Sequence, residues 1–156
     1  MFVITALITS CSQPKQGEKV GYTELNANYS YNTKRVAVEG YLKWDEGDIW
    51  QKMGHKELVT LSVSEKPNGE GESVSFTTYL GSSKNEVSID NGGKSTYTPE
   101  DIVIHLSDGK DVKIGNKILV SGDANYLDTT KFKPFRMKDI VKYSFNLENV
   151  KIENAQ

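Results

Sequence analysis

Cationic and aromatic side chains alternate within residues 131–138, a pattern that suits binding to anionic or planar ligands. The residues concerned are Lys131, Phe132, Lys133, Phe135 and Arg136. Aromatic rings stack on bases and sugars, and cations attract phosphates and other anions. This segment is therefore a candidate contact for a phosphate backbone, a polyanionic glycan or anionic lipid headgroups. The alternative interpretation is that Phe132, Phe135 and Met137 pack into the end of a β-barrel while the basic side chains are solvated.

Three aromatic residues elsewhere in the chain complete the candidate ligand-binding set. Tyr41 and Tyr79 fall on outward positions of alternating segments, and Trp50 follows an acidic turn at residues 45–48. Each could provide a platform for a sugar, a peptide or a base, although tryptophan is more often packed in a core. The acidic turn lacks the ligand spacing of a calcium loop.

The sequence contains no recognisable catalytic, cofactor or metal motif. Its two histidines, His55 and His105, are far apart, and neither lies at a metal-ligand spacing. No Gly-x-Ser-x-Gly motif, phosphate-binding loop or dinucleotide fingerprint occurs. His105 falls on an alternating strand, where a structural or exposed role is expected. We therefore predict a protein that is not an enzyme and that needs neither a cofactor nor a metal.

The single cysteine, Cys11, closes the run Leu7-Ile8-Thr9-Ser10-Cys11 after a short apolar start. An aliphatic residue and two small residues before a cysteine are typical of a bacterial lipobox, in which the cysteine is lipidated and begins the mature protein. This motif predicts a signal peptide over residues 1–10 and a lipidated cysteine with its tether over residues 11–21. The expected localisation is the cell envelope, anchored to the outer membrane through Cys11 and facing the periplasm.

The start of the chain leaves an alternative open. No Lys or Arg precedes Cys11, so the basic segment that normally opens a signal peptide is missing. Either the true start codon lies upstream, or residues 2–9 form a buried first strand instead. The polar segment 12–19 contains Pro14 and Gly17 and is typical of a flexible tether, which favours the lipobox. A net charge of −2 and a pI of about 5.7 argue against a nucleic-acid-binding domain.

Alternating apolar residues predict an all-β fold beyond the tether. The expected strands are residues 34–44, 58–64, 73–80, 102–106, 111–114, 115–122 and 145–152. Residues 102–114 predict a hairpin around a Ser-Asp-Gly-Lys turn. Residues 22–32 are the one candidate for an early helix, and their asparagines weaken it.

Two segments resemble strands of the OB-fold. Arg35-Val-Ala-Val-Glu-Gly40-Tyr-Leu is similar to the first strand, with its mid-strand glycine, and Gly115-Asn-Lys-Ile-Leu-Val-Ser-Gly122 is similar to the start of the fourth. With a closing strand that ends in Val150-Lys-Ile-Glu153, the chain resembles small OB-fold lipoproteins of Gram-negative bacteria and the tRNA-anticodon-type OB superfamily over residues 20–153. The resemblance implies a five-stranded Greek-key barrel over residues 22–153, with a short N-terminal helix and an extra hairpin before the fourth strand.

OB barrels bind ligands on the outer face of the second and third strands and at the loops that join strands one to two and four to five. The outer positions expected here are small and polar: Thr60, Ser62, Ser64, Ser75, Thr77 and Tyr79. Nucleic-acid platforms need more aromatic and basic residues than this face offers. We therefore expect a lipid-anchored envelope module that binds an oligosaccharide, a peptide or a protein partner. The alternatives are a nucleic-acid-binding OB domain and a structural envelope lipoprotein that binds no ligand.

Overall fold

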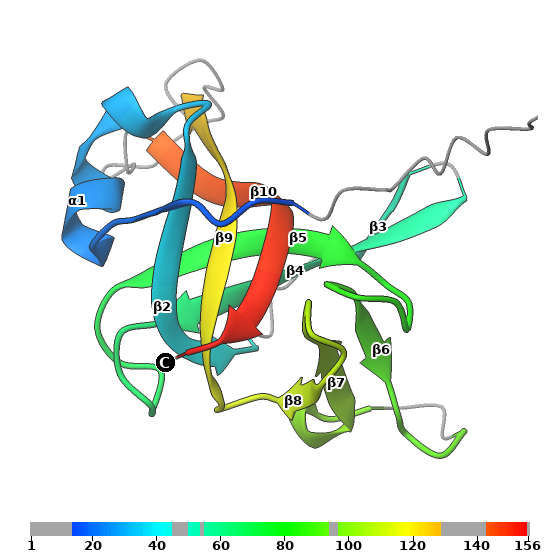
Figure 1. The fold of residues 1–156 in the computed structure, drawn as a ribbon. Helices are drawn as coiled ribbons and strands as arrows, with labels where there is room; N and C mark the ends of the chain where they lie inside the picture. Colours follow the sequence, from blue (N-terminus) through cyan, green and yellow to red (C-terminus); the bar gives the residue numbers. More distant parts are fainter. Residues whose placement is uncertain (1–13, 45–49, 54, 94–96, 129–142, 156) are drawn as a thin grey trace, which may run out of the picture.

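The computed structural model of the 156-residue chain describes residues 14–44, 50–53, 55–93, 97–128 and 143–155 (Figure 1). The strands of this part are β1 (Glu18–Lys19), β2 (Arg35–Lys43), β3 (Trp50–Met53), β4 (Lys56–Ser64), β5 (Ser73–Tyr79), β6 (Val87–Ile89), β7 (Ile102–His105), β8 (Asp111–Lys113), β9 (Lys117–Asp128) and β10 (Tyr143–Asn154). The helical elements are α1 (Tyr22–Ala27) and two 3-10 turns at Tyr29–Tyr31 and Pro99–Asp101.

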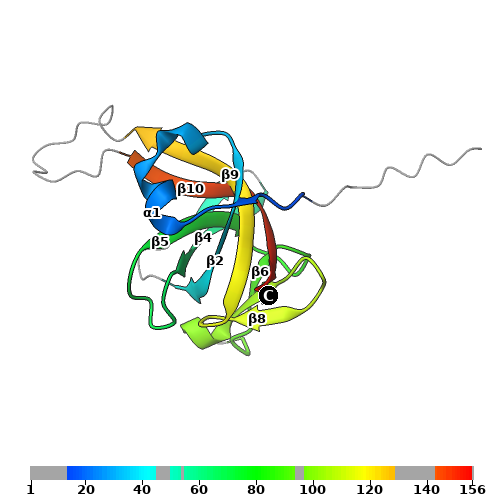
Figure 2. The same cartoon turned by 60° about the vertical axis from the view of Figure 1, so that its left-hand side comes forward.

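Five of the described strands close into a barrel (Figures 1 and 2). β2 pairs with β4, β4 with β5, and β9 with both β10 and β2, all antiparallel, whereas β5 and β10 run parallel. The order around the barrel is therefore β2–β4–β5–β10–β9 and back to β2. This arrangement confirms the all-β, five-stranded OB-like barrel that the sequence predicts.

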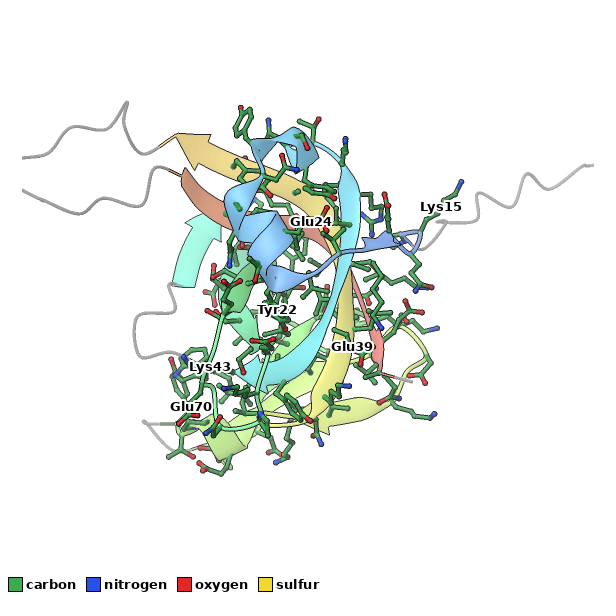
Figure 3. All side chains as sticks on the ribbon, turned by 90° about the vertical axis from the view of Figure 1, so that its left-hand side faces the viewer. Lys15, Tyr22, Glu24, Glu39, Lys43 and Glu70 are labelled. Atoms are coloured by element: carbon green, nitrogen blue, oxygen red, sulfur yellow. The ribbon has the colours of Figure 1, made fainter. Side chains whose placement is uncertain are left out.

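The glycine in the middle of β2 allows other elements to approach this strand closely. The apolar residues on its inner face are Val36, Val38 and Leu42, all buried. At Gly40, on the same face, a Cβ atom would lie 1.8 Å from Tyr22 Oη and 2.6 Å from the Ser64 carbonyl oxygen. Figure 3 shows Tyr22 on α1, which lies against β2. The absence of a side chain therefore lets α1 and β4 close the barrel against β2.

Different elements cover the two ends of the barrel. At one end Leu25 of α1 is fully buried, and Tyr126 Oη donates a 2.6 Å hydrogen bond to the Leu25 carbonyl oxygen. At the other end β6, β7 and β8 form a three-stranded sheet, and Val87, Ile104 and Leu106 from this region join the same core (Figure 1). The predicted hairpin before the fourth barrel strand is thus β7–β8, and β6 adds a strand to it.

The helix α1 is shorter than the helix expected over residues 22–32. It ends at Ala27, and the Asn28 side chain then accepts a 3.0 Å hydrogen bond from Ser30 N to cap a 3-10 turn. Asparagine side chains compete for backbone hydrogen bonds, so they favour caps and turns over helix interiors.

Part of the segment expected to be a flexible tether lies against the barrel. β1 pairs in parallel with β2, and Arg35 Nε donates a 2.5 Å hydrogen bond to the Lys15 carbonyl oxygen. Figure 1 shows this segment crossing the outside of the barrel. The described fold therefore begins before residue 22, and β10 continues it to Asn154. Cys11 lies outside the described residues.

Candidate functional site

The outer face of β4 and β5 is a ladder of hydroxyl groups that bond mainly to one another. The Oγ1 atoms of Thr60 and Thr77 lie 3.1 Å apart, and the Oγ atoms of Ser62 and Ser75 lie 3.4 Å apart. Ser64 Oγ donates a 2.8 Å hydrogen bond to a backbone carbonyl. Cross-strand hydroxyl pairs of this kind stabilise a sheet. This part of the face therefore offers a ligand few unpaired groups.

A cleft of about 540 Å³ opens at the end of this face, and we call it the β5–β10 cleft. Its walls are Leu58, Thr77, Thr78 and Tyr79 from β4 and β5, then Lys84, Asn85 and Glu86, then Glu148, Asn149 and Val150 from β10, with Pro14 also in contact. A volume of this size is within the range of small-ligand sites.

A bulge in β10 separates the two strands that flank the cleft. The parallel pairing with β5 involves only Asn146 and Leu147 of β10. The register of β10 against β9 then shifts between Glu148 and Lys151, and Asn149 has a φ of 51°. Bulges bend a strand and redirect its side chains, often beside functional sites. This bulge places Glu148 and Asn149 on the wall of the cleft.

Asn85 holds the facing wall in place. Its side-chain Oδ1 accepts a 2.7 Å hydrogen bond from Ile152 N, and its backbone N–H donates a 2.7 Å bond to the His105 carbonyl oxygen. Its own carbonyl oxygen accepts a hydrogen bond from the Thr78 hydroxyl. One residue thus bridges β5, β7 and β10. The turn that contains Asn85 is therefore held between β5 and β10, and the cleft is preformed.

Tyr79 provides the aromatic surface of the cleft. It is 42 % exposed, and Lys56 Nζ lies 4.5 Å from the centroid of its ring. A ligand that stacks on this face has to displace the ammonium group, at a cost of about 0.5–1 kcal/mol for an exposed cation–π contact. A ligand that stacks on the ring face covered by Lys56 must therefore gain more than this from its other contacts.

Carboxylates outnumber cations among the described residues that line the cleft. Glu86 accepts a 2.9 Å hydrogen bond from Ser83 N, and Glu148 accepts a 2.8 Å bond from the Asn125 amide. Each carboxylate has about four lone-pair sites and keeps capacity to accept further bonds. Lys84 supplies the one ammonium group of this lining. The balance of charge disfavours a polyanionic ligand.

The two tyrosines singled out from the sequence do not belong to one site. Tyr79 lines the cleft and pairs with Leu58 of β4, whereas Tyr41 is half-buried on β2 and pairs with Ser64. Leu58 and Ser64 are separated along β4 by about 20 Å, at roughly 3.3 Å per residue.

The other candidates from the sequence cannot be placed at the cleft. Trp50 pairs by backbone register with Val59, but its side chain lies outside the described part. The basic and aromatic residues Lys131, Phe132, Lys133, Phe135 and Arg136 lie outside the described residues altogether. The hypotheses about them stay predictions.

Most residues of the cleft have no signature in the sequence. Lys84, Glu86 and Glu148 are polar residues of ordinary appearance. Asn85 and Asn149 carry the one local signal, because asparagine is enriched at positive φ. That signal marks two turns and does not show that they meet in space.

No protein-family model matches the chain, and no curated protein matches its sequence. Within the described ranges, no group of three or more His, Cys, Asp or Glu side chains is placed to hold a metal ion. No helix in the same part of the chain is long and apolar enough to cross a membrane. The geometry of the barrel and its cleft is therefore the basis for a functional proposal.

Proposed function

We propose that this protein is a lipid-anchored binding or accessory module of a bacterial cell envelope, and that its β5–β10 cleft binds an oligosaccharide. The observation that carries this proposal is Tyr79, exposed on the wall of a preformed cleft whose other walls bear amide, carboxylate and ammonium groups. The position of the cleft supports it as well, because OB barrels bind ligands beside the second and third strands.

The groups around Tyr79 match the chemistry of a sugar. A pyranose ring has an apolar face that stacks on an aromatic ring, and a rim of hydroxyl groups that both donate and accept hydrogen bonds. Glu86 and Glu148 can accept from these hydroxyl groups, and Lys84 can donate to them. A neutral oligosaccharide also avoids the repulsion that the two carboxylates would exert on a polyanion.

The nucleic-acid alternative has less support at the cleft. Single-stranded nucleic acid needs several stacking platforms and a positive groove. The described lining offers one tyrosine and one lysine against two glutamates. The basic and aromatic segment 131–136 is the feature that favours this alternative, and a direct comparison of ligands separates the two.

We propose binding rather than catalysis for the cleft. Its described lining contains no His, Cys or Ser side chain that could serve as an imidazole base or as a thiol or serine nucleophile. On this proposal the cleft needs no cofactor. The lipid on Cys11 would hold the module at the outer membrane, facing the periplasm.

The proposal is tested by titrating the full chain, carrying Cys11→Ser, with neutral tetrasaccharides such as chitotetraose and maltotetraose and with a single-stranded oligonucleotide. We expect at least one tetrasaccharide to bind and Tyr79→Ala to weaken it about 10-fold, or 1.4 kcal/mol. Tyr41→Ala, the matched control, should bind as the parent does. Salt-sensitive binding of the oligonucleotide alone, lost when Lys131, Lys133 and Arg136 are neutralised, would replace the proposal with the nucleic-acid alternative.

A further inference from the structure

A serine, a histidine and an aspartate are joined by hydrogen bonds on the three-stranded sheet, outside the β5–β10 cleft. Ser88 Oγ lies 2.8 Å from His105 Nε2, and His105 Nδ1 lies 2.7 Å from Asp111 Oδ1. The His105 side chain is 16 % exposed and Ser88 is half-buried, whereas the Asp111 side chain is 59 % exposed. The sequence predicts no catalytic group here, because the three residues come from three different strands.

Strand pairing accounts for the meeting of these side chains. His105 on β7 is directly opposite Asp111 on β8, and Ser88 on β6 is opposite Val103, two residues before His105. Side chains alternate across a strand, so Ser88 and His105 point away from the core while Ile104 points into it.

Backbone contacts hold the three strands in this register. His105 N donates a 2.9 Å hydrogen bond to the Glu86 carbonyl oxygen, and Leu106 N donates a 2.7 Å bond to the Lys110 carbonyl oxygen. Gly109, with a φ of 88°, allows the tight turn between β7 and β8. The side chains therefore sit on paired strands, which hold a reactive geometry better than loops do.

The order of hydrogen bonds determines the role of each group. A carboxylate accepts only, so the proton shared with Asp111 belongs to His105 Nδ1. In the neutral imidazole this leaves the lone pair on Nε2 to accept the hydrogen bond of the Ser88 hydroxyl. This is the arrangement of nucleophile, general base and orienting carboxylate found in serine acyl-transfer centres.

We propose that Ser88 is a nucleophile that accepts acyl groups from small carboxylic esters, with His105 as its base and Asp111 as the positioning residue for the imidazole. Ser88 Oγ bonds to the ester carbonyl carbon as its proton moves to His105 Nε2. The C–O bond to the alcohol then breaks, and the leaving oxygen takes that proton. A water molecule then gives a proton to His105 Nε2 as its oxygen bonds to the acyl carbon. The bond between that carbon and Ser88 Oγ breaks, His105 returns the proton to Oγ, and the carboxylic acid leaves.

The exposure of Asp111 limits the expected rate. Water solvates an exposed carboxylate and competes for its hydrogen bonds, so Asp111 positions the imidazole less firmly than a buried aspartate does. We therefore expect His105 to contribute about 10- to 100-fold, at or below the lower limit of the roughly 10²–10⁴-fold typical of general-base catalysis. This activity is separate from sugar binding in the cleft, and its failure would leave the binding proposal unchanged.

The test uses the full chain with Cys11→Ser, so that no thiol competes for the reagent. The protein is incubated with p-nitrophenyl acetate and, separately, with a fluorophosphonate probe, and adducts are mapped by mass spectrometry. We expect a single adduct on Ser88 and release of nitrophenolate. Ser88→Ala should abolish both, His105→Asn should slow both about 10-fold or more, and Asp111→Asn should slow both less.

The matched controls are His55→Asn, which removes the other histidine, and Ser75→Ala, which removes a hydroxyl of the barrel face. Both should react as the parent does. Failure of the parent chain to form an adduct at Ser88 would overturn the proposal without the use of any variant. Equal reaction of folded Ser88→Ala, judged by circular dichroism, would overturn it as well and leave the network a structural one.

Discussion

Glu39 joins three strands on the surface of the barrel. It lies on β2 and forms ion pairs with Lys117 of β9 and Lys19 of β1, and Figure 3 labels it where β2 runs beside β9. Hydrogen bonds from Lys117, and then from Lys19, lower the pKa of Glu39 from its ordinary 4.5 to about 2. The folded-state pKa is below the unfolded one. The stabilisation is therefore complete above about pH 4.5 and is lost as the pH falls toward 2.

Glu39→Gln should therefore be less stable than the parent at pH 7 and should approach the parent's stability near pH 2. We expect a difference of about 0.5–1 kcal/mol at pH 7, the range of accessible ion pairs. Urea denaturation at pH 7, 4.5 and 2.5 measures it. The control is Glu70→Gln, which changes an exposed residue of the β4–β5 turn. A gap that stays constant at all three pH values would show that the ion pairs are not its source.

At the scale of elements, β1 is held by close packing as well as by its two paired residues. Gly17 lies so near β2 that a Cβ atom would come within 2.3 Å of the Val36 carbonyl carbon and oxygen. Val20 N donates a 3.0 Å hydrogen bond to the Ala37 carbonyl oxygen just beyond β1. The segment therefore requires glycine at position 17. A Cβ atom there would meet the backbone of β2, which cannot move without disturbing the barrel.

Gly17→Ala should displace the segment around β1 from the barrel and lower the free energy of unfolding by about 1–3 kcal/mol. Gly21→Ala is the matched control, because a Cβ atom there has no neighbour within 4 Å. Denaturation measures the stability, and hydrogen exchange at the Val20 amide reports whether the segment stays docked. Equal stability and protection in the two variants would contradict the close packing.

Dependence on packing against other strands also explains which elements could be predicted from the sequence. β2, β4, β5 and β9 carry long alternating patterns, and their local periodicity is sufficient to identify them. β1 and β3 are short and have no pattern of their own, because they exist only as additions to the edges of a neighbouring strand. The limited length of α1 is likewise a consequence of asparagine side chains that favour caps.

At the scale of the whole molecule, the N-terminal segment connects the predicted anchor to the cleft. Pro14 is part of the cleft lining, and three residues of chain reach at most about 11 Å. If Cys11 bears the lipid, the β5–β10 cleft therefore lies close to the membrane surface. A ligand of the cleft would then be one that occurs near the membrane.

Cys11→Ser should move the protein from the membrane fraction to the soluble fraction when it is expressed in a Gram-negative host. The physical reason is that the several acyl chains on a lipidated cysteine anchor a protein stably, whereas the variant without that cysteine carries no acyl chain to hold it in the bilayer. Fractionation with a high-salt wash, combined with labelling by radioactive palmitate, measures the change. Ser12→Ala is the control and should stay membrane-bound and labelled. Because no basic residue precedes Cys11, all variants are expressed with a short Lys-rich segment added before Met1. A parent protein that is soluble and unlabelled in this form would contradict the lipobox and favour residues 2–9 as a strand.

The sequence alone determined the fold class and most of the barrel. The alternation of apolar residues is a local property, because each side chain of a strand faces the core or solvent according to its position. Gly40 and the Asp108–Gly109 turn are also local signals, and both lie where the pattern predicts a bend or a hairpin. These features could be read without knowledge of which strands pair.

Only the tertiary structure decided the sites. The cleft exists because a bulge in β10 separates this strand from β5, and because Asn85 forms hydrogen bonds to Thr78 of β5 and Ile152 of β10 and lines the cleft between them. Ser88, His105 and Asp111 meet because three strands pair in one register. Tyr41 and Tyr79 are kept apart by the register along β4. Pairing and register are set by long-range contacts of the closed barrel and its caps, which no local pattern specifies.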